Sequence, residues 1–418
     1  GSSGTSGSSG SSGSSGTSGS SGSSGTSGSS GSSGTSGSSG TSGSSGTSGS
    51  SGTSGSSGTS GSSGSSGTSV TVSGTTEYIV KFTSSTTIGD SLTCQQTNGD
   101  LLVNGNVSIG LGAGNVASNT RVGSNTLLYN TTGAYNVAVG SQALTNNTTG
   151  YANLAFGSNT LCSNTIGGYN VAVGKTALSK NTTGINNMAV GGYALACNTT
   201  GRDNTAVGTA ALYKNTIGGN NIGIGSFALA CNTTGIDNTA IGVNAALKNT
   251  TGLCNVNIGK NSGVCNTTGA CNVSLGNNSL FTNTVGSNNT ALGFQSLYSN
   301  TASNNTAVGF CALRRNTTGI LNTALGHQSL RDNTTGLGNT AVGLCTLMLN
   351  VGGLFNTAIG GNSLVINLTG GCNTAVGYQT LQSNTTGNSS TAVGFSALRN
   401  NTASNNTAVG FCALRSNT

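Results

Sequence analysis

The sequence has little of what catalytic and metal-binding sites are usually built from. Its 418 residues include one histidine, six acidic residues, no tryptophan and no proline, and charged residues make up only 5%. No Ser/His/Asp or Cys/His set can be assembled around the single histidine, His327. None of the 11 cysteines lies in C-x-x-C spacing, so we expect no metal site. We predict that the protein is not an enzyme and needs no cofactor.

The chain also has no run of residues apolar enough to form a transmembrane helix. At this length an ordinary composition would suggest two or three globular domains, but the scarcity of charged residues argues against that organisation. The sequence begins without Met and stops within a repeated unit at Asn417-Thr418. We therefore expect it to be an excerpt of a longer or processed protein.

Residues 1–69 are 23 uninterrupted Gly-x-x triplets, each of them GSS or GTS. A glycine at every third position is what a triple helix requires, because only glycine fits its axis. The alternative is a flexible Gly/Ser linker, although a linker has no reason to keep this frame. Without proline, stability would have to come from sugars on Thr or from lateral packing. We predict a triple-helical stalk roughly 200 Å long at about 3 Å per residue, and hence a homotrimer.

Residues 70–119 separate this segment from the rest of the chain. They contain the stretch V-T-V-S-G-T-T-E-Y-I-V-K-F-T-S-S-T-T-I-G-D-S-L at 70–92 and D-L-L-V-N-G-N-V-S-I-G at 100–110. Alternating apolar residues bounded by turn residues indicate several short strands. We interpret the segment as a β-strand adaptor.

Residues 120–418 repeat one 17-residue unit, N-T-A-V-G-x-x-A-L-x-x-N-T-T-G-x-x, eighteen times. Two steps are 16 residues long, at Thr301–Asn304 and at Thr402–Asn405, where the T-T-G turn loses one residue. A strict short period without helical spacing is typical of a solenoid, in which each unit is buried only against its neighbours. We predict an all-β fold, a parallel β-solenoid with 17-residue coils, associated as a trimeric β-roll.

Within a unit, positions are numbered from the glycine of the N-T-A-V-G motif. Apolar or Thr residues alternate with small ones before this glycine, which predicts a strand with the residues at −3 and −1 pointing inward. The A-L pair at +3 and +4 is interpreted as a second short strand. N-T-T-G is expected to close the coil because Asn and Gly tolerate left-handed backbone. The expected core is a Leu, a Val, and a Thr or Val.

Position +7 is Asn in all eighteen units. Identical residues on successive coils stack, so we predict an Asn ladder in which side-chain amides link coil to coil. Many of these residues also form N-x-T sequons, which are glycan acceptors in a secreted eukaryotic protein. The predicted ladder comprises Asn130, Asn147, Asn164, Asn181, Asn198, Asn215, Asn232, Asn249 and Asn266.

These motifs resemble known families. The run G-T-T-E-Y-I-V-K-F-T-S-S-T-T-I-G-D-S-L followed by N-G-N-V-S-I-G is similar to shaft segments of phage tail-fibre-like and bacterial surface proteins, which often end in a cleaved intramolecular chaperone domain. Such segments accompany N-T-A-V-G-x-x-A-L-x-x-N-T-T-G repeats there and in proteins of large DNA viruses. N-T-A-V-G also resembles the N-S-V-A-I-G repeat of trimeric autotransporter adhesin heads. The resemblance covers residues 74–418 and implies a trimeric β-roll fibre on a cell or virion surface.

The basic residues of the repeat concentrate at positions +5 and +6. This phase predicts a sparse stripe along one outward corner of the rod, which serves either solubility or attachment to an anionic glycan or surface. Nucleic acid is not expected as a partner, because the stripe is dilute and lacks interleaved aromatics. The stripe comprises Lys180, Lys214, Lys248, Arg314, Arg315, Arg331, Arg399 and Arg415.

The cysteines of the repeat allow two interpretations. Cys254 and Cys271 share a phase on adjacent coils, about 4.8 Å apart, which a disulfide could span if the side chains face each other. Alternatively the cysteines are buried free thiols that act as small apolar residues. Disulfides between chains are a further version of the first interpretation.

Together these features predict a structural, homotrimeric fibre outside the cell or on a virion, with adhesion to a glycan or cell surface as a second role. Two alternatives remain open. The chains could assemble further into a continuous filament, or stacked Thr residues could form a carbohydrate- or ice-binding face. The inward or turn positions expected for Thr argue against ice binding.

Overall fold

The computed structural model describes residues 107–417 and five short strands between Glu77 and Val103. The chain divides into two compact units, residues 1–106 and 107–418, which are considered separately below. The predicted triple-helical stalk, residues 1–69, lies outside the described residues.

The first unit contains the short strands expected of the adaptor. β4 pairs with β7 and β7 with β8, all antiparallel, and β5 pairs antiparallel with β6. The strands are β4 (Glu77–Tyr78), β5 (Lys81–Phe82), β6 (Ile88–Gly89), β7 (Thr93–Gln95) and β8 (Leu101–Val103).

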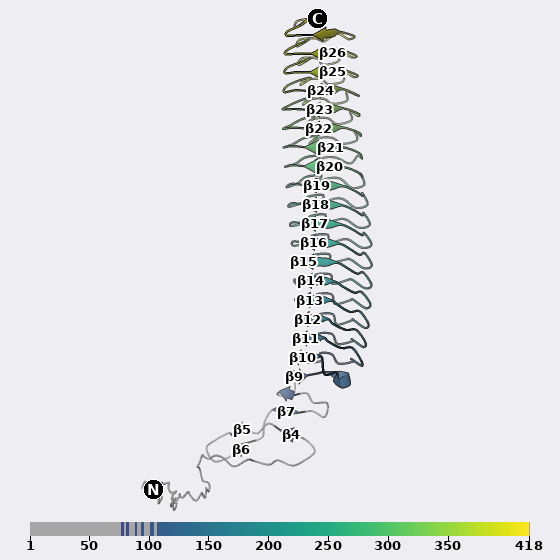
Figure 1. Ribbon diagram of the computed structural model, residues 1–418, viewed down its shortest axis with the longest axis vertical. Coiled ribbons are helices and arrows are strands. Elements are labelled where there is room, and N and C mark those ends of the chain that lie inside the picture. The colour runs from purple at the N-terminus through teal and green to yellow at the C-terminus, as the bar shows by residue number, and fades with distance from the viewer. Residues whose placement is uncertain are drawn as a thin grey trace, which may run out of the picture. The chain divides into compact units, whose positions relative to one another are not determined.

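The second unit is a parallel β-solenoid, as the repeat predicts. Each coil contributes one three- or four-residue strand, and each strand pairs in parallel with the equivalent strand of the next coil, so that the strands stack in one column (Figure 1). The strands are β10 (Thr120–Gly123), β11 (Val137–Val139), β12 (Leu154–Phe156), β13 (Val171–Val173), β14 (Met188–Val190), β15 (Thr205–Val207), β16 (Ile222–Ile224), β17 (Thr239–Ile241), β18 (Val256–Ile258), β19 (Val273–Leu275), β20 (Thr290–Leu292), β21 (Thr306–Val308), β22 (Thr323–Leu325), β23 (Thr340–Val342), β24 (Thr357–Ile359), β25 (Thr374–Val376), β26 (Thr391–Val393) and β27 (Thr407–Val409).

The first coil differs from those that follow it. β9 (Val107–Gly110) pairs antiparallel with β10 and covers the edge of the sheet, and a 3₁₀ turn, η1 (Ala113–Asn115), follows. At position −2, where later coils have a small residue, this coil has Arg121, which is 7% exposed and donates from Nη1 to the Thr126 carbonyl at 2.9 Å. A covered first edge prevents strand addition at that end of the sheet.

The interior of a coil is narrower than the sequence suggests. In the coil of β15 the fully buried apolar residues are Ala206, Ala211 and Leu212, at positions −2, +3 and +4. The strand residues at −3 and −1, Thr205 and Val207, are only half-buried and face away from the core. The expected inward facing of −3 and −1 is therefore wrong: the small middle residue points inward, because the stacked coils leave room there for little more than a methyl group.

The expected second strand at A-L is also absent, because this stretch is a turn in each coil. Leu212 is buried with a φ of 53°, and Ala210 two residues earlier has a φ of 57°. Left-handed backbone costs about 1–2 kcal/mol in a residue other than glycine. At +4 this conformation turns the Leu side chain into the core, and its burial contributes about 1.5–3 kcal/mol, which offsets the backbone cost.

The two glycines of the repeat serve different purposes. Gly208, the motif glycine, has a φ of 131°, and a Cβ there would lie 2.7 Å from the Gly225 backbone of the next coil. Gly218, the glycine of the N-T-T-G turn, does not have a positive φ. The expectation that this turn needs glycine for left-handed backbone is therefore wrong. A Cβ on Gly218 would lie 2.3 Å from the Gly235 carbonyl oxygen, so glycine is needed there for close coil packing.

Midway along the rod the apolar core is interrupted. The core forms two clusters, one from Leu127 to Ala246 and one from Leu280 to Ala408. Between them Gly263 replaces the Leu at +4, and the Asn257 amide fills the space, since a Cβ on Gly263 would lie 2.1 Å from Asn257 Oδ1. Ser274 donates from Oγ to that oxygen at 2.6 Å. A buried polar cluster of this kind is tolerated because its members satisfy one another.

The facing of the +4 and +6 positions can be tested by substitution. Leu212→Ala should lower the free energy of unfolding of the surrounding coils by about 2–5 kcal/mol, because it opens a cavity in a closed core. Lys214→Ala should have almost no effect, since Lys214 is exposed. Hydrogen exchange of the flanking coils measures both changes, and equal effects would contradict the assigned facing.

Candidate functional site

Because equivalent residues stack, every position of the repeat becomes a column along the solenoid. The +7 asparagines form a buried column of amides. Asn232 donates from Nδ2 to Asn215 Oδ1 of the preceding coil at 2.7 Å and to the Gly235 carbonyl of its own turn at 3.0 Å. The same pair of bonds recurs from Asn147 to Asn283 and includes every predicted ladder residue.

A second column of asparagines runs beside the first, at position −4. The backbone N–H and Nδ2 of Asn238 both donate to Asn221 Oδ1 of the preceding coil, at 3.0 and 3.2 Å. Asn221 in turn donates from Nδ2 to the Gly235 carbonyl at 2.8 Å. The carbonyl of Gly235 thus receives one amide from each column. The sequence has Asn at −4 in every unit but one, where Ser390 replaces it, but the partners of these asparagines depend on how the coil closes and could not be read from the sequence.

These bonds decide between the two interpretations of the N-x-T sequons at +7. Asn232 is fully buried, and its Nδ2 already donates two hydrogen bonds. A glycan on that nitrogen would require it to point to solvent. In the folded solenoid the sequon asparagines are therefore structural groups of the ladder.

The ladder breaks at each of the two 16-residue coils. Asn300 donates from Nδ2 to the Ala302 carbonyl of its own shortened turn at 2.7 Å and no longer reaches Asn283. At the second short coil, Asn401 likewise donates from Nδ2 to the Ala403 carbonyl and does not reach Asn384 of the preceding coil. The Oδ1 atoms of Asn283 and Asn384 are buried without a hydrogen-bond partner. An unsatisfied buried acceptor costs about 1–3 kcal/mol, so these two steps are weak points of the rod.

The outward face of the sheet is an uncharged column of strand residues. Positions −3 and −1 of β10 to β27 are occupied only by Thr, Val, Ile, Leu, Met and Phe. Several of these side chains are more than a third exposed, among them Phe156, Ile241 and Leu325 at 55%, 37% and 47%. A long uncharged face with exposed aliphatic and aromatic side chains is a candidate interaction surface.

The basic residues of the expected stripe fall into two columns. Those at +6, Lys180, Lys214, Lys248 and Arg315, are exposed. Of those at +5, Arg314, Arg331 and Arg399 are half-buried, and Arg415 in the last coil is exposed. The lysines lie two coils apart and stand alone, whereas the arginines of the later coils contact neighbouring side chains.

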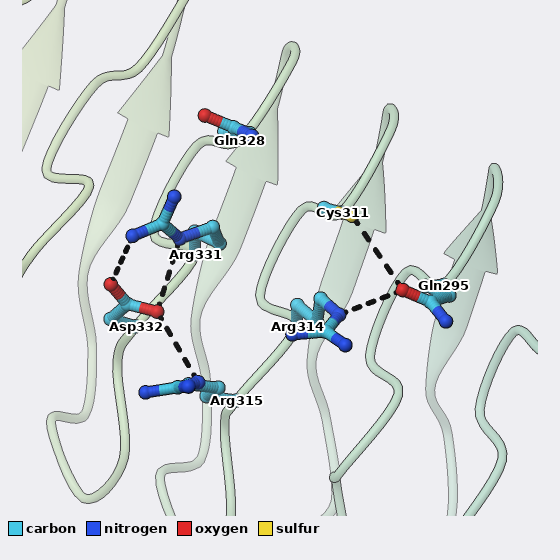
Figure 2. A pocket seen from close by; sticks show the side chains of 7 residues that line it. All are labelled: Gln295, Cys311, Arg314, Arg315, Gln328, Arg331 and Asp332. Carbon is cyan, nitrogen blue, oxygen red and sulfur yellow. Dashed lines mark hydrogen bonds and ion pairs between the residues drawn. The ribbon is translucent and has the colours of Figure 1, made fainter.

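Three of these arginines line a pocket of about 380 Å³. Figure 2 shows the pocket between consecutive turns, and none of its seven lining residues lies in a strand. The Arg331 guanidinium pairs with both carboxylate oxygens of Asp332, and Arg315 Nε lies 3.6 Å from Asp332 Oδ1. The hydrogen bond that Arg331 donates to Asp332 raises the pKa of the guanidinium above its usual value, so the group is charged at any physiological pH. The pocket residues are Gln295, Cys311, Arg314, Arg315, Gln328, Arg331 and Asp332.

Aromatic rings form two short stacks at position +1 in the later coils. Phe294, Phe310 and His327 are stacked with ring centroids 5.4 and 5.1 Å apart and interplanar angles of 11° and 12°. Tyr378, Phe395 and Phe411 form an equivalent stack. The inner rings have both faces covered by their neighbours, so these columns bind coil to coil and present ring edges outward.

The structure describes Cys254 and Cys271 as exposed free thiols on adjacent coils. Desolvation, followed by the neighbouring Cys271 and Asp237, raises the pKa of the Cys254 thiol, so the thiolate form that would start disulfide exchange is disfavoured. Cys311 is buried, and its desolvation likewise raises its pKa. The disulfide between Cys254 and Cys271 stays a prediction.

Within residues 107–417 and the short strands before them, no group of histidine, cysteine or acidic side chains could hold a metal ion. The same described part of the chain contains no helix that could cross a membrane.

Residues 1–72 match the family model described as collagen triple helix repeat (20 copies). No curated protein and no solved structure matches the chain. The match supports the collagen-like interpretation of the N-terminal segment, and the likeness of the 17-residue repeats to phage, viral and adhesin repeats stays a prediction. A collagen-like repeat joined to a β-solenoid indicates a structural, fibre-like protein.

The ladder can be tested at one of its members. Asn232→Ala should lower the stability of its coil by about 1–3 kcal/mol, because it removes a donor from the buried Asn215 Oδ1 and from the Gly235 carbonyl. Hydrogen exchange in the adjacent coils should rise. Asn277→Ala, on the exposed surface, is the matched control. Equal effects of the two substitutions, or an N-linked glycan on Asn232 in the folded protein, would contradict the ladder.

The weak points can be repaired. Inserting Gly between Ala302 and Ser303 recreates the turn N-T-x-G-S-N-N found at Asn283–Asn289. The restored turn should let Asn300 reach Asn283 Oδ1 and should stabilise the flanking coils by about 1–3 kcal/mol, measured as slower hydrogen exchange. Inserting Gly after Gly286 makes an 18-residue coil and should destabilise it. If both insertions destabilise equally, the missing hydrogen bond is not what weakens this step.

Proposed function

We propose that the protein is the subunit of a homotrimeric fibre located outside the cell or on a virion. Its N-terminal segment would form a triple-helical stalk, and three solenoids would pack together as a rod. The observation that supports this most strongly is the uncharged face formed by positions −3 and −1. It occurs in the same chain as a segment that matches collagen repeats, which associate in threes.

Second and third copies of the chain suit this face for geometric reasons. A triple helix holds its three chains parallel and in register, so three identical solenoids would begin at the same level. Each would present the same column of Thr and apolar side chains to its neighbours, with no charge to desolvate. Burying an aliphatic side chain such as Ile241 contributes about 1.5–3 kcal/mol relative to leaving it exposed. Because the solenoid's own interior is thin and consists mostly of Ala and Leu, burial between chains would add substantially to its stability.

In this arrangement the function is mechanical: the protein supplies reach and rigidity. Adhesion to an anionic glycan or cell surface is the second role, carried by the basic residues at +5 and +6. These residues lie on turns and not on strands, so packing of the sheet faces leaves them available. Assembly of trimers into a longer filament is a further form of the same proposal.

One observation favours a second candidate, an ice-binding surface. The expectation that Thr points inward is wrong, since the residues at −3 face outward. Thr occupies this position in eight consecutive coils, from Thr290 to Thr407, each paired in register with the next. A flat, regular Thr face could order water, but it would have to stay uncovered. Thermal hysteresis of the full chain, together with a monomeric mass, would favour this candidate over the fibre.

The fibre is tested by mass and by one pair of variants. Light scattering of the full chain should give three times the chain mass of 40.3 kDa. Ile241→Glu should lower the melting temperature of the solenoid by removing about 2 kcal/mol per chain of burial. Val243→Glu, an equally exposed apolar residue two positions later and off the strand, should be neutral. A monodisperse monomer, or equal melting of the two variants, would refute the trimer.

A further inference from the structure

One guanidinium of the arginine-lined pocket is held in place by neutral neighbours. Arg314 donates from Nε to Gln295 Oε1 at 2.8 Å, and its guanidinium carbon lies 5.5 Å from the centre of the Tyr298 ring. Both partners belong to the preceding coil and neither carries a negative charge. The side chain is therefore oriented without being neutralised, and the two terminal nitrogens retain donors for a ligand. Figure 2 shows these nitrogens on the pocket side of Gln295.

The charge balance of the pocket is positive. Three arginines from two adjacent coils share a single carboxylate, that of Asp332. Asp332 is taken up by Arg331, which it pairs with through both oxygens, and the side chain of Arg315 stays 64% exposed at 3.6 Å. Two positive charges are left over, on Arg314 and Arg315. A planar guanidinium is the best protein group for a planar carboxylate, which it can bind through two parallel hydrogen bonds.

The remaining polar groups suit hydroxyl groups. The amides of Gln295 and Gln328 line the same pocket, Gln295 beside Arg314 and Gln328 near Arg331 (Figure 2), and an amide both donates and accepts. A volume of about 380 Å³ falls at the small end of the range for ligand sites and is suited to one or two sugar rings.

Nucleic acid fits this surface poorly. The aromatic rings near the pocket already pack against other groups: Phe310 is stacked between Phe294 and His327, and Tyr298 is stacked on Phe281 and contacts the Arg314 guanidinium. Binding of single strands relies on free aromatic faces. The basic residues elsewhere in the repeat are too sparse to follow a phosphate backbone.

We propose that this pocket binds a carboxylate-bearing sugar unit of a surface glycan, with Arg314 and Arg315 holding the carboxylate and the two glutamines holding ring hydroxyls. Arg331 and Asp332 act as positioning residues that keep Arg315 at the pocket. The inference deepens the adhesive role and rests on that part of the proposed function, but it does not depend on the trimer. It also assigns attachment to one place on the rod. The isolated lysines at +6 carry no guanidinium, and Arg399, which donates from Nε to Gln382 Oε1 at 2.7 Å, has Asn400 and not a second arginine at +6 of its coil.

The test uses the full chain and a tetrasaccharide of hexuronic acid in isothermal titration calorimetry at low salt. The unmodified protein should bind it, and the same tetrasaccharide with its carboxylates reduced to alcohols should bind about tenfold more weakly or not at all. Arg315→Gln should weaken binding by about tenfold, and because that side chain is largely exposed the variant should fold normally. Arg314→Gln should have the same effect. Lys214→Gln is the matched control and should bind as the unmodified protein does.

Other outcomes would overturn the proposal. Equal binding of the acidic and the reduced tetrasaccharide would exclude a carboxylate-specific site. Unchanged binding in Arg315→Gln, or an equal loss in Lys214→Gln, would mean that attraction to the whole basic stripe is responsible. Tighter binding of a sulfated tetrasaccharide than of the uronic acid one would exclude selection for a planar carboxylate. Light scattering of the same samples keeps this result separate from the trimer, since no binding with an intact trimer refutes the site alone.

Discussion

The solenoid depends on how a narrow coil can satisfy its buried backbone. The coil interior is narrow and holds mainly Ala and Leu with other small side chains. The turn that closes each coil is buried as well, and a buried carbonyl must find a donor. Two asparagine columns supply it: the Gly235 carbonyl receives Nδ2 of Asn232 from its own coil and Nδ2 of Asn221 from the preceding one. A glycine is needed at that point because any Cβ would collide with the next coil. Asn, Gly and the 17-residue period are thus parts of one constraint.

That constraint explains where the fold is uniform and where it is not. A coil one residue shorter cannot place its asparagine against the previous one, which leaves Asn283 Oδ1 and Asn384 Oδ1 buried without partners. By contrast the loss of Leu at Gly263 is accommodated, because Asn257 and Ser274 fill and satisfy the space. A side chain inside the coil can change where its neighbours compensate, whereas a shorter coil leaves a buried acceptor without a partner.

Much of the fold could be predicted from the sequence, and the failures have a common cause. The period, the parallel solenoid and the burial of Leu212 and Asn232 follow from strict repetition, whereas the expected second strand of each coil is a turn. The facing of Thr205 and Val207 does not, because alternation along a strand gives two faces without saying which one is inside. The left-handed Leu212 is equally hidden, since a buried Leu looks like a strand residue in the sequence. The stripe of basic residues was visible as a phase, but the clustering of Arg314, Arg315 and Arg331 at one pocket depends on turn geometry.

The reversed facing moves the apolar strand residues from the interior to the surface, and the account of function follows from that change. In the proposed fibre, the face formed by positions −3 and −1 would mediate assembly, and the turn residues would remain accessible for recognition. The most direct measurement of the central claim is hydrogen exchange along the unmodified solenoid. The backbone N–H groups of the −4 asparagines, such as Asn238, should be strongly protected along the solenoid, and protection should fall in the two short coils, next to Asn300 and Asn401. Uniform protection across both short coils, or ready exchange at the −4 asparagines, would contradict the claim that asparagine columns hold the coils together.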